Sequence, residues 1–220
     1  MPDSPLLALA STSPRRRAFM QELGLACAAI GTDIDESPRP GEEPVALACR
    51  LAEEKAAAAV RILAGQVTPH LVIAADTVVA LDGELLGKPV DPAAAVRMLT
   101  LLRARSHFVH TAISVLHTGG RQRTRVNSTR VVMRDYSDRE IADYVATGDP
   151  MDKAGAYAIQ HPQFRPVDHL EGCMSGVMGF PLGDLRDLLA ELGFHMPCAV
   201  VDVCQRQTHF PCCQQLGAAG

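Results

Sequence analysis

The chain has no tryptophan, and aromatic residues make up only 4% of its 220 residues. A platform of aromatic side chains that stacks single-stranded nucleic acid is therefore not expected. A basic surplus is missing as well, because 21 Lys and Arg stand against 25 Asp and Glu, giving a formal net charge of −4. Since broad binding to nucleic-acid phosphates needs such a surplus, we expect no nucleic-acid partner.

Long apolar runs and targeting signals are also absent. No apolar run approaches the roughly 20 residues of a membrane span, and residues 1–4 lack the basic start of a signal peptide. The seven cysteines are an odd number without a C-x-x-C pair. Their number and spacing favour reduced thiols over a zinc site or a disulfide framework. These absences predict a cytoplasmic protein without a membrane partner.

What is present is typical of a folded domain, with 47% apolar and 21% charged residues. We predict one functional unit over residues 1–196. Residues 197–220 show no clear apolar period and end in a Gly-Ala-Ala-Gly sequence. A terminal segment of this kind is predicted to be partly disordered.

The stretch from residue 6 to residue 17 joins a short apolar strand to a helix through a polar turn. Ser13 suits the N-cap, and Pro14 suits the first helical position. Arginines occupy positions 15–17, where the partial positive charge of a helix N-terminus repels them. A bound anion would make this placement favourable, because the free N–H groups of a helix start suit phosphate. A solvated basic turn is the alternative, and charge placement alone does not decide between the two.

One carboxylate interrupts a near-continuous apolar run. Residues 71–81 are typical of a central strand that is buried on both faces, yet Asp76 lies in its middle. An unpaired buried carboxylate is costly. Asp76 must therefore be paired, hold a metal or open onto a cleft, and the pattern favours a functional role.

Other charged residues are open to two interpretations. Lys55 lies within a predicted helix over residues 44–64, where a lysine is usually a snorkelling surface residue unless the helix faces a site. The acidic cluster of residues 33–36 could hold a divalent metal or balance nearby charge. His107 and His110 are three apart on a predicted strand and face opposite sides, which weighs against a shared metal.

The rest of the chain alternates predicted helices, strands and loops. A capping box at Ser137 opens one of these helices. The predicted elements are a strand over 25–30, a helix over 91–103, an antiparallel pair of strands over 107–116 and 124–133, a helix over 137–148, a short strand near 157–160, a flexible loop over 170–176 and a helix over 181–192.

An ordered set of motifs resembles the Maf family of nucleotide pyrophosphatases. The set covers most of the chain from Leu6 to about Leu192, and its order is far more specific than any single motif. The matching motifs are residues 9–16, the loop around Glu36, residues 50–56, 75–79, 87–89, 152–160 and 179–182.

The resemblance implies an elongated α/β fold, in which a two-lobed mixed sheet is flanked by helices around a central nucleotide-binding cleft, as in Maf and inosine triphosphatase proteins. It implies a house-cleaning hydrolase that cleaves a nucleoside triphosphate between its α and β phosphates. A divalent cation, Mg²⁺ or Mn²⁺, is the implied cofactor. The implied partners are the triphosphate substrate and a second copy of the chain in a homodimer.

The resemblance also implies roles for individual residues. Asp76 matches the general base, and Glu36 together with Asp76 matches the metal ligands. The positions that match phosphate contacts are Ser11, Arg15, Arg16, Lys55 and Lys88.

Three positions bear on the choice of base. The family branch that acts on dTTP and UTP resembles this chain at Arg15, Thr77 and Gln160, whereas the 7-methyl-GTP branch tends to carry Trp, Gln and Glu there. A glutamine amide can match the alternating acceptors and donor of thymine and uracil, while a carboxylate suits the adjacent donors of guanine. The resemblance therefore predicts dTTP and UTP, or modified pyrimidine triphosphates. The alternatives are a 7-methyl-GTP pyrophosphatase and a non-catalytic nucleotide-binding regulator of septum formation.

The chain departs from the family pattern in one loop. Met174 and Gly176 occupy positions where the family usually has Tyr and Asn. This departure bears on base stacking and on the order of the loop, and with them on base specificity. The segment after residue 197 has no family counterpart.

Overall fold

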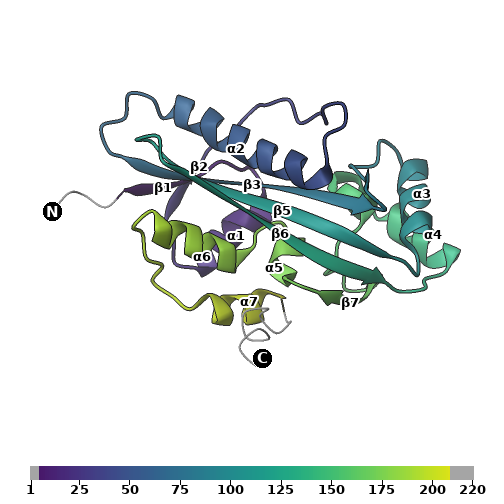
Figure 1. The fold of residues 1–220 in the computed structure, drawn as a ribbon. Helices are drawn as coiled ribbons and strands as arrows, with labels where there is room; N and C mark the ends of the chain where they lie inside the picture. The colour runs from purple at the N-terminus through teal and green to yellow at the C-terminus, as the bar shows by residue number, and fades with distance from the viewer. Residues whose placement is uncertain (1–4, 209–220) are drawn as a thin grey trace.

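A long mixed sheet runs through the molecule in the strand order β2-β1-β3-β5-β6-β7, with the short β4 paired to β3 (Figure 1). β1 pairs in parallel with β2 and β3, whereas the pairs β3–β5, β5–β6 and β6–β7 are antiparallel. The computed structural model describes residues 5–208. Its strands are β1 (Leu6–Leu9), β2 (Cys27–Ala29), β3 (His70–Leu81), β4 (Glu84–Leu85), β5 (Ser106–His117), β6 (Gln122–Met133) and β7 (Val167–Glu171).

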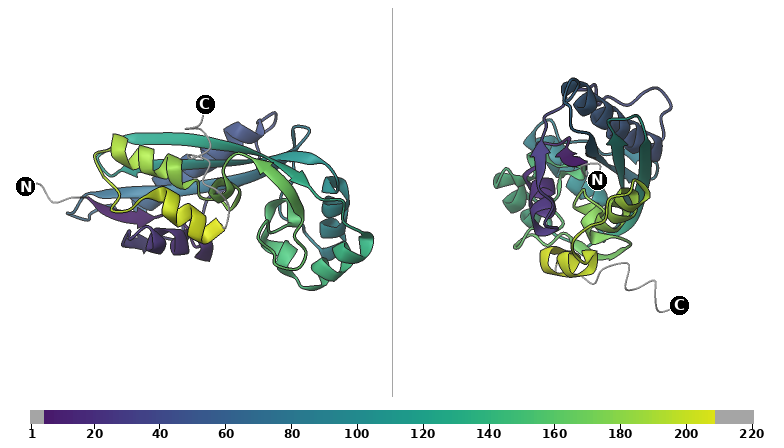
Figure 2. Two further views of the ribbon diagram at one scale, coloured as in Figure 1. Left: turned by 90° about the horizontal axis from the view of Figure 1, so that it is seen from below. Right: turned by 90° about the vertical axis from the view of Figure 1, so that its left-hand side faces the viewer.

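Helices cover both faces of this sheet. α2 lies along one face, α1, α6 and α7 lie on the other, and α3 with α4 stands at the far end of the long strands (Figure 1, Figure 2). The helices are α1 (Pro14–Glu22), α2 (Pro44–Ile62), α3 (Pro92–Leu102), α4 (Asp138–Ala146), α5 (Met174–Val177), α6 (Leu182–Glu191) and α7 (Val200–Thr208), with the 3₁₀ turns η1 (Asp149–Asp152) and η2 (Ala154–Ala156).

Separate apolar cores make the molecule two-lobed. The core of the first lobe packs α1, α6 and α7 around Leu9, Phe19 and Phe180, and that of the second lobe packs α3 and α4 around Leu99 and Tyr136. The long strands β3, β5 and β6 run through both lobes, which gives the molecule its elongated shape (Figure 2). The predicted fold, a two-lobed α/β mixed sheet flanked by helices, is confirmed.

Local sequence signals explain most elements. Leu47 and Leu51 lie one turn apart on α2 and pack against Val78 of β3 and Ala112 of β5. The predicted antiparallel pair of strands is confirmed as β5 and β6. The capping box of α4 is also confirmed, because the Ser137 side chain accepts from the N3 backbone while the N3 glutamate accepts from the Ser137 backbone.

Two local predictions were wrong. The short strand expected near residues 157–160 is an irregular segment that ends in a turn. The Tyr144 hydroxyl accepts the Ala158 N–H at 3.0 Å, and the Ala158 carbonyl accepts the His161 N–H at 3.1 Å, so these groups pair with no neighbouring strand. The loop expected over 170–176 instead contains the end of β7 and the start of α5, where the Cys173 side chain accepts from the Gly176 N–H.

Residues 200–208 form a helix that the sequence analysis did not predict. Within 197–220, the partly disordered tail that the sequence predicted, α7 forms a helix whose Val200 and Val203 enter the same core as Phe19 of α1. α7 therefore belongs to the first lobe. Residues 209–220 lie outside the described residues.

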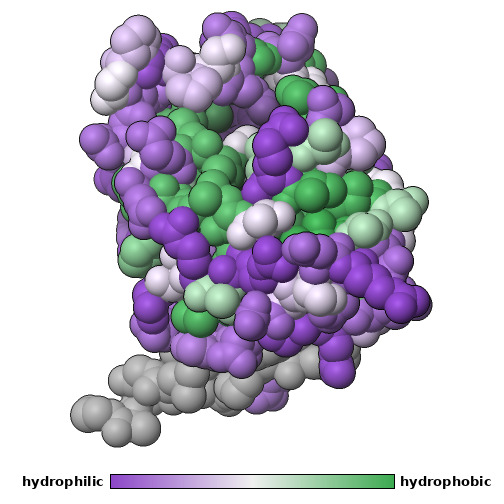
Figure 3. Space-filling view, turned by 90° about the vertical axis from the view of Figure 1, so that its right-hand side faces the viewer, coloured by the Kyte–Doolittle hydropathy of each residue, from purple (hydrophilic) through white to green (hydrophobic). Residues whose placement is uncertain are grey.

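The surface is largely hydrophilic at the end of the molecule that carries α3. Figure 3 views this end of the molecule and shows apolar areas near its middle that are bounded by hydrophilic residues. Val96 and Leu101 of α3 are 38% and 45% exposed, so part of that helix remains uncovered. Within residues 5–208, no helix is both long and apolar enough to cross a membrane.

Candidate active-site cleft

A cleft of about 1020 Å³ opens between the two lobes. Its walls come from the β1–α1 turn, the loop before α2, α2 itself, β3, the turn after β4 and residues 152–159. The structure brings together all the predicted site residues except Gln160. Those that line the cleft are Ser11, Arg15, Arg16, Glu36, Lys55, Asp76, Thr77 and Lys88.

The start of α1 forms one wall. Ser13 caps the helix by accepting the Arg16 N–H at 3.5 Å, and Pro14 takes the first helical position. Ser11 Oγ accepts the Ser13 N–H at 3.2 Å, so hydroxyl groups order the turn itself. The first turn holds no acidic side chain. The helix start and Arg15 therefore present positive charge to the cleft.

Arg16 differs from Arg15 because backbone oxygens hold its guanidinium. Nη1 donates to the Ala75 carbonyl at 2.7 Å, and Nε donates to the Gly179 carbonyl at 2.9 Å. Burial lowers the pKa of Arg16, and the nearby Asp76 carboxylate partly offsets this effect. Arg16 contributes charge to the cleft wall while it ties α1 to β3 and to the turn before α6.

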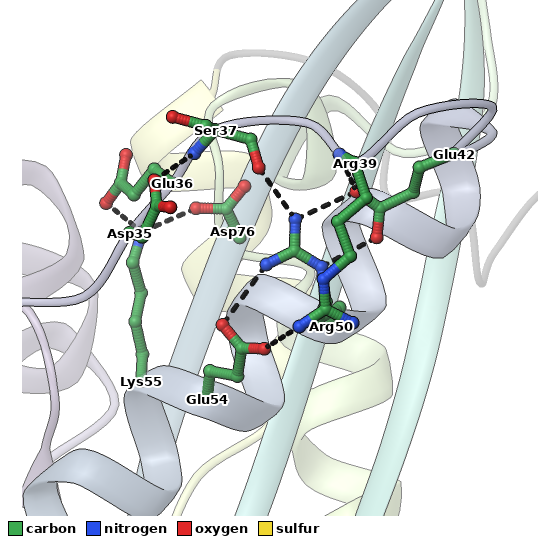
Figure 4. Close-up of polar contacts among 9 residues, drawn as sticks. All are labelled: Asp35, Glu36, Ser37, Arg39, Glu42, Arg50, Glu54, Lys55 and Asp76. Carbon is green, nitrogen blue, oxygen red and sulfur yellow. Dashed lines mark hydrogen bonds and ion pairs between the residues drawn. The ribbon is translucent and has the colours of Figure 1, made fainter.

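At the centre of the cleft an ammonium group lies between two carboxylates (Figure 4). Nζ of Lys55, from α2, lies 2.5 Å from Oδ1 of Asp76 on β3 and 2.7 Å from Oε1 of Glu36. The side chains of Lys55 and Asp76 are 12% and 10% exposed, whereas that of Glu36 is 55% exposed. Lys55 is therefore not a surface lysine, and the buried Asp76 is paired.

The two carboxylates differ in acidity. Burial raises the pKa of Asp76, and the opposing effects of Lys55 and Arg16 offset only part of the rise. Burial acts in the same direction on Glu36, but Lys55, Lys88 and Arg16 outweigh it and lower the pKa of Glu36. A carboxylate with a raised pKa is the better proton acceptor. Asp76 therefore suits the role of a base, and Glu36 suits that of a permanently charged ligand.

Lys88 enters the cleft from the turn that follows β4. The second lobe fixes the backbone of this turn, because the Gly155 N–H donates to the Leu86 and Gly87 carbonyls at 3.0 and 3.1 Å. Gly155 has a φ of +71°, and a Cβ there would lie 3.1 Å from Val79 Cγ1. Glycine suits both the backbone angle and the close approach.

The predicted specificity residues Thr77 and Gln160 lie in different environments. Thr77 lines the cleft, and its Oγ1 lies 2.9 Å from Oγ1 of Thr111. Gln160 is exposed, and its Nε2 donates to the Gln207 carbonyl of α7 at 2.9 Å. The neighbouring residues 158–159 line the cleft, but the Gln160 side chain is directed to α7 instead.

Met174 and Gly176, where the chain departs from the family pattern, pack in the protein interior. Met174 belongs to the core that α7 completes. Gly176 lies against β6, where a Cβ would come within 2.8 Å of Oδ1 of Asn127. The cleft is lined instead by the residues that follow, 177–179. The departure can therefore affect the cleft only through the backbone of this segment.

A buried pair in the second lobe was missed by the sequence analysis. Tyr157 lines the cleft, and its hydroxyl lies 2.7 Å from Nε2 of His107. Burial lowers the pKa of His107 to about 4, so the imidazole is neutral at pH 7. Its Nδ1 has no hydrogen-bond partner among the described residues. The two residues are 50 positions apart, and no local pattern indicates their contact.

Asp152 and Lys153 add a balanced pair of charges to the second-lobe wall. Nζ of Lys153 lies 2.6 Å from Oδ1 of Asp152 and 3.0 Å from Oδ1 of Asp149. These residues belong to the motif 152–160, in which the sequence analysis gave a role to Gln160 alone. Because acidic partners surround Lys153, it contributes less than Arg15 or Lys88 to the field that an anion meets.

The cleft therefore combines a positive helix start, cationic side chains from separate elements and a buried carboxylate of raised pKa. Attack by water on phosphorus requires an oriented nucleophile and neutralised phosphate charge more than covalent chemistry. The arrangement suits the hydrolysis of a polyphosphate.

Comparison with known proteins agrees with this chemistry. A family model described as "Maf-like protein" matches residues 6–192. A Chromobacterium violaceum protein named dTTP/UTP pyrophosphatase is 47% identical over 190 residues, which are 86% of this chain and 96% of the relative. A Myxococcus xanthus protein of the same name is 44% identical over 195 residues, 89% of this chain and 96% of its own. A solved Mycobacterium abscessus structure, titled a nucleoside-triphosphatase / dITP/XTP pyrophosphatase, aligns with 59% of this chain and 74% of its own at 14% identity and a TM-score of 0.37.

Proposed function

The chain belongs to the Maf-like protein family, and from this premise we propose that it is a pyrophosphatase for dTTP and UTP. Relatives that carry this name align with the chain over nearly their whole length, which supports the proposal. The reaction hydrolyses the bond between the α and β phosphates and yields a nucleoside monophosphate and pyrophosphate. It is a house-cleaning reaction of nucleotide metabolism, and the family's link to septum formation extends its effect to cell division.

One observation carries the proposal: a buried carboxylate, Asp76, faces a cleft lined by cations from separate elements. Asp76 accepts a proton from water as the water oxygen attacks the α phosphorus. The bond from that phosphorus to the bridging oxygen breaks, and pyrophosphate leaves with the bond's electron pair. Arg15, Arg16, Lys55 and Lys88 neutralise the charge of the phosphates, and Ser11 orients them at the start of α1.

A divalent cation, Mg²⁺ or Mn²⁺, is part of the proposal. Mg²⁺ is usually held by one or two carboxylates together with waters and substrate phosphates. Glu36 and Asp76 fit this donor set, because oxygens of both contact the same ammonium group of Lys55. Among residues 5–208, no group of three or more His, Cys, Asp and Glu side chains could hold a metal, so a bound cation would take its remaining ligands from substrate and water. The bound metal would supply charge neutralisation at the phosphates.

In this proposal, Arg15, Thr77 and Gln160 recognise the pyrimidine base of the nucleotide. The Gln160 amide nitrogen donates to the Gln207 carbonyl of α7, so reading the nucleotide base requires this side chain to turn toward the cleft wall that residues 158–159 line. The amide oxygen is then the atom that suits the single N–H donor of thymine and uracil. Cleavage of modified pyrimidine triphosphates falls within the same recognition chemistry.

A panel assay tests the proposal directly. Pyrophosphate release is measured for dTTP, UTP, 7-methyl-GTP and other triphosphates with Mg²⁺ or Mn²⁺, for the wild type and for Asp76→Asn. We expect dTTP and UTP to give the highest kcat/KM and the variant to fold but lose at least about a hundredfold in kcat. A higher kcat/KM for 7-methyl-GTP would instead assign the chain to that branch. Binding without turnover would indicate a non-catalytic regulator.

Two further properties complete the proposal. Because nucleoside triphosphates are cytoplasmic metabolites, we place the protein in the cytoplasm. We also propose the homodimer that the family resemblance implies. Light scattering of the purified protein tests the dimer, and a monomer mass at all concentrations would refute it.

A further inference from the structure

The loop that carries Glu36 has little regular structure to hold it. Residues 30–43 contain no helix or strand, and most of them are exposed. Two residues of this loop pack against apolar clusters of α2, Ile30 beside Ala56 and Ala59 and Ile34 around Leu47. The contact between Glu36 and Lys55 therefore depends on polar interactions that fix the loop to α2.

Arg50, on the second turn of α2, makes that connection (Figure 4). Its Nε donates to Oε1 of Glu42 at 2.6 Å, and its Nη2 donates to Oε2 of Glu42 at 2.8 Å. Nη2 also donates to the carbonyl of Ser37 at 3.0 Å. The side chains of Arg50 and Glu42 are 12% and 10% exposed, so this bidentate pair is largely shielded from water. One guanidinium thus holds both the end of the loop and the residue beside Glu36.

Hydrogen bonds hold both backbone polar groups of Ser37, the residue that follows Glu36. The Ser37 N–H donates to Oδ1 of Asp35 at 2.9 Å, while the Ser37 carbonyl accepts from Arg50. With these two groups engaged, the backbone at Glu36 has little freedom to turn. The Glu36 side chain is thereby directed toward the centre of the cleft (Figure 4).

Arg50 is not required to build the hydrophobic core. Leu47 and Leu51 form the large apolar contacts of this part of α2. The remaining contact of Arg50 is with Glu54, one turn further along the same helix, at 3.2 Å. Arg50 is also not among the residues that line the cleft. Its contacts serve the loop.

We propose that Arg50 is a positioning residue: paired with Glu42, it fixes the loop 30–43 so that the Glu36 carboxylate meets Lys55 beside Asp76. The inference rests on the pyrophosphatase activity proposed above. Arg50 touches no substrate and acts through Glu36. The residue lies in the motif 50–56, in which Lys55 alone had received a role.

The test uses full-length variants in the pyrophosphate assay. Arg50→Gln removes the bidentate pair, Glu42→Gln weakens it from the other side, and Arg50→Lys keeps the charge without the fork geometry. Arg61→Gln, at the exposed last turn of α2, is the matched control. We expect Arg50→Gln and Glu42→Gln to lower kcat about 10- to 100-fold, as loss of a partner that orients a ligand does, with little change in KM. Arg50→Lys should be intermediate, and the control should match the wild type.

Two further measurements separate positioning from a general structural effect. Hydrogen exchange of the peptide spanning residues 33–43 should become faster in Arg50→Gln and Glu42→Gln but not in Arg61→Gln. If Arg50 acts through Glu36, then Arg50→Gln combined with Glu36→Gln should be no slower than Glu36→Gln alone.

An unchanged kcat in an Arg50→Gln variant of an active enzyme, or losses that multiply in the double variant, would overturn the inference alone. Should Arg50→Gln fail to fold, Glu42→Gln is judged by the same criteria. A wild type that releases no pyrophosphate from any triphosphate would overturn the proposed function and, with it, this inference.

Discussion

Replacing Lys55 by methionine tests whether an ammonium group occupies the place of a divalent cation. Nζ of Lys55 contacts both Asp76 and Glu36, so the variant leaves two carboxylates facing each other without a cation. Removing one partner of a buried ion pair costs about 3–5 kcal/mol. The partly exposed Glu36 can be solvated, so we take the lower end, about 3 kcal/mol. For a domain of this size each kcal/mol shifts Tm by about 2–4 °C, which predicts a Tm about 6–12 °C lower in a chelating buffer.

A divalent cation should then restore the stability of the Lys55→Met variant. A ligand at a hundred times its Kd stabilises the native state by about 2.7 kcal/mol, which is close to the expected loss. In the wild type a metal must first displace Lys55, so the rise in Tm that the metal causes without nucleotide should be smaller than in Lys55→Met. The assay is thermal unfolding with a chelator and with increasing Mn²⁺, in the absence of nucleotide. It needs no catalytic activity.

Lys153→Met is the matched control for this experiment. Lys153 also lines the cleft and is also held by two carboxylates, Asp149 and Asp152, but these lie on the opposite wall. Mn²⁺ should not raise its Tm more than that of the wild type. The reasoning is refuted if Lys55→Met melts at the wild-type temperature, or if Mn²⁺ stabilises the wild type more than this variant.

Three other substitutions test separate features. Burial lowers the pKa of His107 to about 4, whereas an unfolded histidine titrates near 6.5. Between these pH values only the unfolded state binds the proton. The unfolding free energy of the wild type should therefore fall by about 3 kcal/mol as pH drops from 7 to 4. That acid loss should be absent from urea unfolding of His107→Phe, and an equal loss would contradict the assignment. Gln160→Leu removes the amide oxygen and should lower kcat/KM for UTP about tenfold, the value of one hydrogen bond, and an unchanged value would exclude Gln160 from base reading. Arg16→Gln should lower the unfolding free energy by about 3 kcal/mol, because it leaves the Ala75 and Gly179 carbonyls without their hydrogen-bond donor. Arg15→Gln should change the unfolding free energy by less than about 0.5 kcal/mol and raise KM. The reverse pattern would contradict the structure.

The elements that the sequence predicted well are those with local causes. The cap at Ser13, the capping box at Ser137 and the alternating strands β5 and β6 depend on residues a few positions apart. The sequence analysis missed α7 because few of its residues are apolar. Val200 and Val203 are buried only because the core of α1 and α6 lies beside them, and their spacing alone does not show this.

The sequence predicted those site residues whose charge is energetically unfavourable at their position unless a partner or ligand compensates it. A carboxylate within an apolar strand had to be paired or functional, and Asp76 proved to be paired with Lys55. The bidentate contact of Arg50 with Glu42 had no comparable signal, because charged residues at a helix start and in the loop before it are ordinary. Its importance depends on burial and on a backbone carbonyl, and neither can be read from spacing.

The sequence treats Arg15, Arg16 and Arg17 at the start of α1 alike. Helix-dipole repulsion leaves either a bound anion or a solvated basic turn open for all three. The structure divides them, because the Ala75 and Gly179 carbonyls already supply negative partial charge to Arg16. Exposed Arg15 has no comparable backbone partner among the contacts of the described residues. The case for an anion at this helix start therefore rests on Arg15, on the hydroxyl of Ser11 and on the free N–H groups of the first turn. Arg16 instead explains why α1 stays fixed to the strand that carries Asp76 when the anion is absent.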